Sequence, residues 1–226
     1  MRVVVTGTSR GIGRAAALRY LELGHEVFGI DIAPATVEHP RYTHAVADVR
    51  QAEALPDIEG AEVLFINAGV QNGADDIATN LVGAINTAEK YIRNNGALKS
   101  ILFNASASSV SGQEFPRYVA SKAGLAGYMR NVAIRLAPRG VTCNAISLGG
   151  VLTDSNDAVL AEPALWEQIM AVTPMKKWTA LDEVCDWVAF LTLKNRSMSG
   201  QNLLIDNGEK DLNATFVWPG FGEENT

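Results

Sequence analysis

The chain has 226 residues, enough for one sizeable α/β domain, and its 47% apolar and 19% charged residues are typical of a globular protein with a substantial core. A formal net charge of −6 gives no electrostatic reason to expect nucleic acid or an anionic membrane surface as a partner. Two cysteines are too few for a disulfide framework or a zinc cluster, so we expect a reducing, cytoplasmic compartment.

Short β-branched runs alternate with longer segments of helical periodicity, the pattern of parallel βαβ units. The first apolar run, residues 3–5, is too short for a signal peptide or a membrane span. Strands are predicted at residues 3–5, 25–31, 42–49, 63–67, 101–103, 141–146 and 203–206, and helices at 11–23, 77–92, 115–137 and 182–193.

This order predicts an α/β fold: a single-domain, Rossmann-like, doubly wound parallel sheet of about seven strands with helices on both faces. No repeat or linker divides the chain, so residues 1–226 are expected to form one dinucleotide-binding and catalytic domain. Within it, residues 154–178 are irregular or helical, and residues 209–226 form a tail containing Gly, Trp and Pro.

A glycine-rich turn joins the first predicted strand to the first helix. Gly7 can take the sharp turn off the strand, Gly11 lets the backbone approach a pyrophosphate, and Gly13 lets helix and strand pack tightly. The N–H groups and the positive end of the helix dipole would then face the phosphates. The turn therefore predicts dinucleotide binding, and the alternative is a tight turn in front of an empty helix end.

Two residues near this turn give opposite indications about the cofactor. Asp31 ends the second predicted strand, where a carboxylate can accept hydrogen bonds from the adenosine ribose and would repel the extra phosphate of NADP. Arg10 lies in the turn itself, where a guanidinium could bind that phosphate. Because the position of Asp31 matches the ribose-binding role, we expect NAD, with NADP possible.

Tyr118 and Lys122 lie four residues apart in a predicted helix and so share one face. A phenol has a pKa near ~10, and a neighbouring ammonium, together with the positive nicotinamide ring, would lower that pKa and make the group a usable acid or base. Ser106 follows the fifth predicted strand, at the edge where such sheets bind ligands. Its hydroxyl could hold the substrate oxygen, although Ser108, Ser109 and Ser111 crowd the same loop.

With these motifs the chain resembles the short-chain dehydrogenase/reductase family over nearly its whole length. The spacing Gly7-x-x-x-Gly11-x-Gly13 is the family's own. The other matching segments are Asp48-Val49, Asn67-Ala68-Gly69, Asn80 within residues 80–83, the catalytic segment 118–122, and residues 144–153, which resemble the stretch around the nicotinamide carboxamide.

The resemblance implies that Tyr118 is the acid/base, Lys122 its electrostatic partner, Ser106 the holder of the oxygen and Asn80 part of a proton relay. It also implies that Val151 and Thr153 fix the nicotinamide ring. The predicted cofactor-binding residues are Gly7, Ser9, Arg10, Gly11, Ile12, Gly13, Asp31, Asp48, Val49, Asn67, Ala68, Gly69, Tyr118, Lys122, Val151 and Thr153.

The chain departs from the family at several points. Only ten residues separate Gly69 from Asn80, far fewer than is usual, so the border of the cleft is expected to be trimmed and its mouth open. The distance from Ser106 to Tyr118 is one residue shorter than the commonest spacing, which leaves the choice of serine open.

Other residues are less informative. His25, His39 and His44 have no metal-ligand spacing, so no metal is predicted and solvated or capping roles are favoured. Segment 154–178 contains the apolar residues Trp166, Met170, Met175 and Trp178. These residues form either a substrate wall or a small lid core or subunit contact. The apolar tail 216–221 is expected to pack on a neighbouring subunit or to close the cleft.

Together these observations predict an NAD-dependent oxidoreductase that transfers a hydride between nicotinamide and a secondary alcohol or ketone. One alternative is an NADPH-dependent reductase of 3-oxoacyl thioesters, and another is a non-catalytic dinucleotide sensor or partner protein. The expected partners are a small-molecule alcohol or carbonyl substrate and further copies of the chain in a tetramer or dimer, with no nucleic acid and no membrane. The sequence does not identify the substrate.

Overall fold

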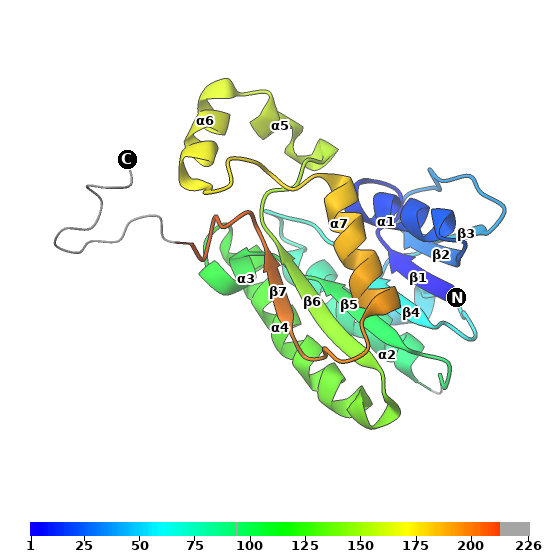
Figure 1. Ribbon diagram of the computed structural model, residues 1–226. Helices are drawn as coiled ribbons and strands as arrows, with labels where there is room; N and C mark the ends of the chain where they lie inside the picture. The colour runs from blue at the N-terminus through cyan, green and yellow to red at the C-terminus, as the bar shows by residue number, and fades with distance from the viewer. Residues whose placement is uncertain (94, 213–226) are drawn as a thin grey trace.

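Seven parallel strands form a single sheet in the order β3-β2-β1-β4-β5-β6-β7 (Figure 1). The computed structural model describes residues 1–93 and 95–212, so the predicted contact of the tail 216–221 lies outside the described residues. The prediction of a Rossmann-like, doubly wound parallel sheet is confirmed. The strands are β1 (Arg2–Thr6), β2 (Glu26–Asp31), β3 (Tyr42–Val46), β4 (Val63–Ile66), β5 (Ser100–Asn104), β6 (Thr142–Leu148) and β7 (Asn202–Ile205).

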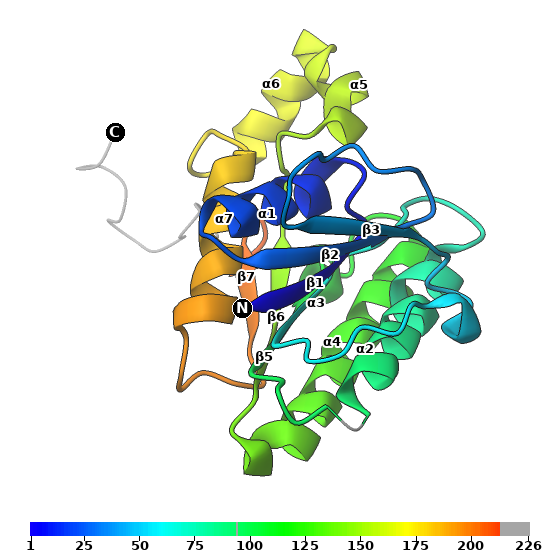
Figure 2. The ribbon, with the colours of Figure 1, turned by 90° about the vertical axis from the view of Figure 1, so that its right-hand side faces the viewer.

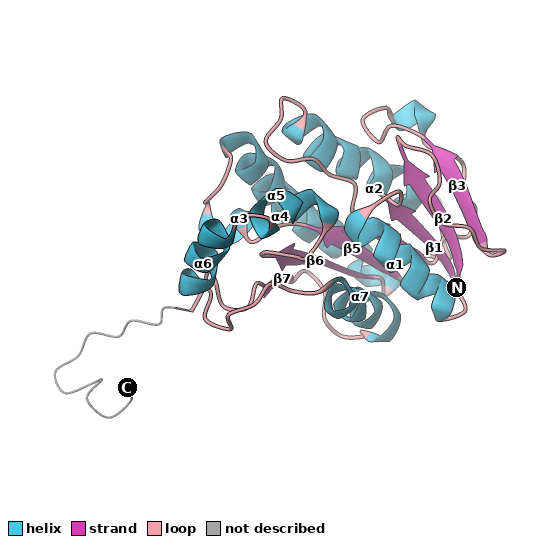
Figure 3. Cartoon of the chain, turned by 90° about the horizontal axis from the view of Figure 1, so that it is seen from above, coloured by secondary structure: helices cyan, strands magenta, loops and turns pink. Residues whose placement is uncertain are grey.

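Helices cover both faces of this sheet, and the view from above separates the two layers (Figure 3). Helices α1 (Gly11–Glu22) and α7 (Leu181–Ala189) lie on one face. Helices α2 (Ala84–Ile92) and α4 (Pro116–Leu136) lie on the other, and the one-turn helix α3 (Ser108–Ser111) packs against α4. Short 3-10 turns are η1 (Ala52–Ala54), η3 (Ala137–Arg139) and η4 (Asp154–Asn156).

The alternation of side chains along each strand divides the core into two clusters. In β1, Val4 belongs to the cluster beneath α2 and α4, whereas Val3 and Val5 belong to the cluster beneath α1 and α7. All three valines are buried, at most 1% exposed. The continuous apolar runs of the central strands are therefore explained by burial on both faces.

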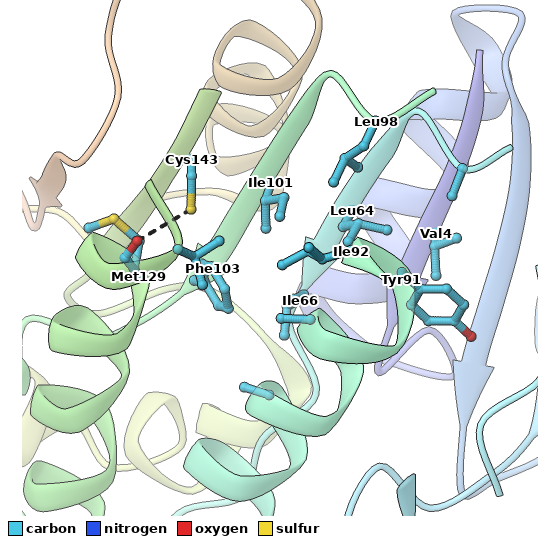
Figure 4. Packing of buried hydrophobic residues seen from close by; sticks show 14 of the residues in the cluster. Val4, Leu64, Ile66, Tyr91, Ile92, Leu98, Ile101, Phe103, Met129 and Cys143 are labelled. Carbon is cyan, nitrogen blue, oxygen red and sulfur yellow. Dashed lines mark hydrogen bonds between the residues drawn. The ribbon is translucent and has the colours of Figure 1, made fainter. Parts of the chain in front are cut away.

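Figure 4 shows the cluster on the α2–α4 face. In Figure 4, Ile92 of α2 lies near Ile66 of the sheet, Tyr91 of α2 lies near Val4, and Met129 of α4 lies near Phe103. At its edge Cys143 contacts the backbone carbonyl of Met129 at 3.5 Å. Cys143 and Cys185 are both buried free thiols, and burial raises the pKa of each, so neither is activated as a nucleophile.

Several element boundaries differ from the predictions. The predicted helix 77–92 begins as a π-helix, η2 (Ile77–Gly83), and only then continues as α2, while α7 ends in a second π-helix, η5 (Phe190–Lys194). Strand β3 ends at Val46 rather than at residue 49. Val49 packs instead against Gly83, where a Cβ atom would come within 2.6 Å of its side chain. Strand β6 extends two residues further, because Ser147 and Leu148 pair with β7.

Residues 154–178 contain α5 (Asp157–Leu160) and α6 (Pro163–Val172), which agrees with the expectation of irregular or helical structure. Figures 1 and 2 show both helices beyond the end of the sheet at which β6 terminates. The strands are parallel, so this is the carboxyl end for all seven. Within the described part of the chain, no helix has the length and apolar character needed to cross a membrane.

Candidate active site

A cleft of about 910 Å³ opens at the carboxyl end of the sheet. Its walls come from the residues that follow all seven strands, together with the start of α4. In a doubly wound sheet this edge is the place where ligands bind. Most of the predicted site residues, although far apart in the sequence, line this one cleft.

The glycine turn forms the floor of the cleft. Gly7 and Gly11 have φ angles of +76° and +52°, which favour glycine, and a Cβ at Gly11 would meet open space. Among the described residues no side chain caps α1, and its first turn carries no carboxylate, so its N–H groups remain available to an anion. This arrangement fits a pyrophosphate.

Ser9 and Gly13 belong to the turn but do not line the cleft. The Ser9 hydroxyl donates to the carbonyl of Pro34 at 2.8 Å and so holds the loop after β2. Gly13 serves packing, because a Cβ there would lie 2.0 Å from the carbonyl oxygen of Gly7. Gly7, Arg10, Gly11 and Ile12 do line the cleft.

Asp31 lies at the end of β2 and faces the cleft. One carboxylate oxygen accepts the backbone N–H of Ser9 at 2.9 Å and the other accepts that of Ala33 at 2.9 Å. These bonds fix the direction of the carboxylate, and each oxygen keeps a lone pair that can accept a ligand hydroxyl. Arg10 lines the same cleft.

Asp48 and Val49 reach the cleft after β3, accompanied by Arg50, which the sequence analysis missed. The Arg50 guanidinium binds Asp48 with both its Nε and its Nη2 atoms, and it also pairs with Asp75 at 2.9 Å. Its hydrogen bonds hold the pKa of the Asp48 carboxyl below its usual value. The two-residue spacing of Asp48 and Arg50 was the available signal.

Asn67, Ala68 and Gly69 follow β4 and tie three strand ends together. The N–H groups of Asn67 and Ala68 both donate to the Thr6 hydroxyl at the end of β1, at 2.9 and 3.0 Å. The Asn67 amide oxygen accepts from Asn104 at the end of β5, at 2.8 Å. The segment therefore fixes the relative positions of the strands beneath the cleft.

Tyr118 and Lys122 occupy the first turns of α4, and the lysine Nζ lies 5.6 Å from the centre of the tyrosine ring. The Lys122 side chain is only 4% exposed, and its Nζ donates to the carbonyl oxygen of Asn104 at 2.7 Å. Because that carbonyl ends β5, the bond sets α4 against the edge of the sheet. Both side chains line the cleft as predicted.

Burial dominates the acidity of both groups. It raises the pKa of the Tyr118 phenol, with the Ser106 hydroxyl acting in the opposite direction and the charges of Glu114 and Asp76 adding to the rise. The neighbouring lysine is not among the causes of this shift, so the expectation that its ammonium, together with a bound nicotinamide ring, lowers the pKa of Tyr118 stays a prediction. Burial also lowers the pKa of Lys122 to about 8, against the charges of Asp76 and Glu114.

The serines of the loop after β5 separate clearly in space. Ser106 lines the cleft and accepts hydrogen bonds from the N–H and the hydroxyl of Ser108, at 3.2 and 3.0 Å. Ser108 is buried beneath it, Ser109 contacts the Ser147 hydroxyl at 3.1 Å, and Ser111 is exposed outside the cleft. This placement favours Ser106 as the serine that faces a substrate.

Asn80 is buried in the π-helix η2. Its amide oxygen accepts the N–H of Val70, and its amide nitrogen donates to the carbonyl of Val70, both at 2.8 Å. The same nitrogen also donates to the Ser121 hydroxyl at 3.1 Å. Its side chain thus holds the loop after Gly69, and the predicted part of Asn80 in a proton relay stays a prediction.

Val151 and Thr153 line the far end of the cleft, where Val151 forms a parallel bridge with Thr179. Trp178 lies against Gly150, since a Cβ at that glycine would come within 2.0 Å of the indole Nε1. The ring of Trp166 packs edge-on against Trp178 with centroids 5.2 Å apart. Trp178 is thus both a cleft wall and part of a small lid core, whereas Met175 is 61% exposed.

Comparison with known proteins decides the family. A family profile described as enoyl-(acyl carrier protein) reductase matches residues 7–210. The chain belongs to the short-chain dehydrogenase/reductase family. As a member it is an oxidoreductase acting on alcohols or ketones, and the resemblance stated from the sequence is confirmed.

Two curated relatives show how far the similarity extends. Glucose 1-dehydrogenase of Gluconobacter oxydans is 29% identical, over 92% of this chain and 91% of the relative. The 3-oxoacyl-[acyl-carrier-protein] reductase FabG of Staphylococcus aureus is 30% identical, over 91% of this chain and 96% of the relative.

Solved structures share the same fold. One from Beutenbergia cavernae, described as an NAD(P) dependent gluconate 5-dehydrogenase with bound NADP, has a TM-score of 0.84 and 27% identity, and the match covers 92% of this chain and 96% of that one. A 4-hydroxyisoleucine dehydrogenase complexed with NADH also has a TM-score of 0.84, at 20% identity, covering 94% and 99%.

Beyond the motifs of this dehydrogenase/reductase family, polar residues missed in the sequence gather beside Tyr118. Glu114 accepts a hydrogen bond from Gln71 at 2.9 Å and has an unusual φ of +85°. Lys210 donates to Gln113 at 2.9 Å and pairs with Glu209 at 2.7 Å. The four-residue spacing of Glu114 and Tyr118 was a signal for the first, whereas nothing in the sequence pointed to Lys210.

The three histidines lie outside the cleft. His44 contacts the carbonyl oxygen of Ala33 at 3.0 Å, and His39 accepts the N–H of Arg41 at 3.1 Å. His25 contacts the amino terminus at 3.1 Å. Across residues 1–93 and 95–212, no group of three or more His, Cys, Asp or Glu side chains is placed to hold a metal ion.

The lowered pKa of Lys122 predicts a pH-dependent stability. Between about 8 and the usual value of 10.5, the unfolded chain binds a proton that the folded protein has released, so the free energy of unfolding should rise with pH in this window. The rise should total on the order of 3 kcal/mol, at about 1.4 kcal/mol per pKa unit. Urea unfolding of wild type and Lys122→Met at pH 7 to 10.5 should show it as a growing difference in favour of wild type.

Lys99→Met is the matched control, since Lys99 is 58% exposed and pairs with Glu62 at the other end of the sheet. Its difference from wild type should stay constant across this range. Parallel curves for wild type and Lys122→Met would contradict the burial of the charge.

Proposed function

We propose that this protein is a nicotinamide-dinucleotide-dependent oxidoreductase that interconverts a secondary alcohol and its ketone, with Tyr118 as the acid/base. The main support for the proposal is that Tyr118, Lys122 and Ser106 line the same cleft as the glycine turn at the start of α1. The sheet, the cleft and residues 154–178 would act as one dinucleotide-binding and catalytic domain.

Each residue has a distinct part in the proposed reaction. The bound dinucleotide would supply or accept the hydride. In the reducing direction Tyr118 donates its phenolic proton to the developing alkoxide, and in the oxidising direction its phenolate takes the proton of the alcohol. Ser106 holds the substrate oxygen in line with the phenol. Lys122 presents an ammonium beside the ring, and with a bound cationic nicotinamide this charge would oppose the effect of burial on the phenol.

The cofactor residues support NAD over NADP. Asp31 is the side chain at the end of β2 that faces the cleft, and its carboxylate is held in place by the N–H groups of Ser9 and Ala33. It offers acceptors to ribose hydroxyls and repels an added phosphate. NADP is the alternative, because the Arg10 guanidinium could bind its extra phosphate. Of the similar solved structures, one contains NADH and another contains NADP.

Asp31→Asn tests the cofactor preference. Loss of the negative charge should weaken ribose binding and remove the repulsion of a 2′-phosphate, so the ratio of kcat/KM with NADH to that with NADPH should fall by about tenfold or more. The matched control is Glu38→Gln, an exposed carboxylate in the loop after β2. A wild type that prefers NADPH, or a ratio unchanged in Asp31→Asn, would contradict the choice of NAD.

The cleft beside Tyr118 favours a polar, hydroxylated substrate. Gln71, Glu114, Glu209 and Lys210 all line this part of the cleft, and burial raises the pKa of Glu114. Such carboxylates and amides are suited to accept or donate hydrogen bonds to several hydroxyls, whereas an acyl chain or a terpene would leave them without partners. We therefore place the substrate among sugars, polyols and sugar acids, ahead of the acyl-thioester alternative.

Replacing Glu114 by Gln tests the substrate class. We expect a wild type most active on polyhydroxylated alcohols in a panel that also contains acyl thioesters and apolar alcohols. The variant should raise KM for the best substrate about tenfold, the effect of losing a hydrogen bond to a charged group, and change kcat less. Glu53→Gln, an exposed carboxylate in η1 outside the cleft, should leave KM unaltered. Preference for an apolar alcohol would overturn the assignment.

We also propose that the protein forms a homo-oligomer, a tetramer or a dimer. The support is the outer face of the helical layer on the α4 side, where Ile134 of α4 is 75% exposed and Val82 of η2 is 43% exposed. Exposed apolar residues on neighbouring elements are typical of subunit contacts.

Tyr118→Phe separates an enzyme from a dinucleotide sensor. Removal of the hydroxyl should leave dinucleotide affinity within a few-fold and lower kcat by about 10²- to 10⁴-fold, because the proton has no other carrier at the reacting oxygen. Tyr128→Phe is the matched control, since the Tyr128 hydroxyl bonds Glu89 of α2 at 2.7 Å and the residue does not line the cleft. Turnover that survives in Tyr118→Phe would remove the acid/base role, and a wild type that binds dinucleotide but converts nothing would favour the sensor.

A further inference from the structure

An ion pair lies in the cleft, in the turn that follows β7. Lys210 Nζ and Glu209 Oε1 are 2.7 Å apart, and both residues line the cleft. The two side chains are only 12% and 15% exposed, so the pair is largely withdrawn from water. A cation and a carboxylate in that setting neutralise each other, and removal of one partner leaves a poorly solvated charge.

The turn holds this pair in a fixed position. Asp206 is 6% exposed, and its two carboxylate oxygens accept the N–H groups of Gly208 at 2.9 Å and Lys210 at 2.7 Å. Gly208 has a φ of +84°, which favours glycine. The Lys210 ammonium donates to the side-chain oxygen of Gln113 at 2.9 Å. Its charge is thus held beside the loop that leads into α4 and Tyr118.

The other cations that line the cleft already have partners or a place in the proposed site. Arg50 is paired with Asp48 and Asp75. The Lys122 ammonium is buried and donates to a backbone carbonyl. Arg10 belongs to the glycine turn, where the phosphates of a dinucleotide are expected. Among the described residues beside the predicted acid/base, the buried lysine aside, no uncompensated cation lines the cleft to bind a substrate carboxylate.

The same part of the cleft is rich in groups that bind hydroxyls. Gln71 donates to Glu114 at 2.9 Å, and both residues line the cleft together with Glu209 and Lys210. A hydroxyl can donate to a carboxylate and accept from an ammonium or an amide, so it satisfies this mixed set without adding charge. A substrate carboxylate in the same place would be repelled by Glu114 and Glu209. The charge balance therefore favours an uncharged substrate.

We propose that Glu209 is a specificity-determining residue that neutralises Lys210, and thereby excludes substrates with a carboxylate and admits uncharged polyols and sugars. Discrimination between two substrates is a difference of free energies, and a repulsive element against the competitor contributes to that difference. Without the charge of Glu209, the Lys210 ammonium would bind the carboxylate of a sugar acid. The inference rests on the proposed oxidoreductase function and narrows its substrate class to the uncharged members.

Glu209→Gln tests the proposal, because glutamine keeps the size and hydrogen-bonding capacity of the side chain but not its charge. The probes are three matched pairs of polyol and sugar acid: D-glucitol and D-gluconate, D-mannitol and D-mannonate, and D-galactitol and D-galactonate. Wild type should be more active on the polyols. In the variant the ratio of kcat/KM for acid to that for polyol should rise about tenfold or more, through a lower KM for the acid, and the rise should shrink at high salt.

Two further variants make the result specific. Glu209→Gln combined with Lys210→Met should lose the gain, since the cation that would bind the acid is gone. Glu26→Gln is the matched control, because Glu26 pairs with Arg2 at 3.1 Å outside the cleft, and its ratio should equal that of wild type. A wild type that prefers the acids, a ratio unchanged in Glu209→Gln, or a gain that survives in the double variant would overturn the proposal.

A binding measurement needs no turnover and separates this inference from the proposed function. In calorimetry with NAD present, D-gluconate should bind Glu209→Gln about tenfold more tightly than wild type. A wild type that oxidises no alcohol contradicts the proposed function, whereas a tighter gluconate complex in the variant still supports the role of the Glu209 charge. Equal affinities, or a variant that does not fold, would assign the ion pair to the fold and overturn the inference.

Discussion

The buried ammonium of Lys122 is the constraint on which the site depends. A charge that is 4% exposed requires fixed acceptors, and the one within the described chain is the Asn104 carbonyl at the end of β5. That bond sets the position of α4 on the sheet. Tyr118, one turn earlier, is thereby carried over the cleft and next to Ser106, which the end of the same strand supplies. The position of Tyr118, the predicted acid/base, therefore follows from the hydrogen bond that the buried Lys122 ammonium requires.

Negative charge beside the buried pair favours the charged form of Lys122 but disfavours the charged form of Tyr118. Negative charge from Asp76 and Glu114 keeps the lysine protonated but disfavours the phenolate, so neither carboxylate can tune one group without the other. The Ser106 hydroxyl acts on the phenol alone and offsets part of this penalty. The protonation states of Tyr118 and Lys122 are therefore coupled, and they depend together on Asp76, Glu114 and Ser106.

The sequence predicts the parts of this molecule that depend on short-range patterns. Short β-branched runs predicted the strands, and the glycine spacing and the Tyr118–Lys122 spacing each act within one or two turns. The π-helix at residues 77–83 was invisible, because its apolar positions match α-helical periodicity equally well. The approach of Lys210 to Gln113 could not be predicted either, since only the tertiary fold places the end of β7 beside the start of α4. The raised pKa of Tyr118 likewise depends on burial, which no local pattern reveals.

The short connection after Gly69 determines how the chain enters η2. With ten residues between Gly69 and Asn80, the chain has no room for a separate helix and enters η2 directly beneath the cleft. Asp76, the residue immediately before that helix, is buried, with 1% of its surface exposed. The π-helix, a form frequent at functional sites, carries Asn80 and packs against α4. The short connection after Gly69 thus ends in a buried carboxylate whose charge acts on the Lys122 ammonium.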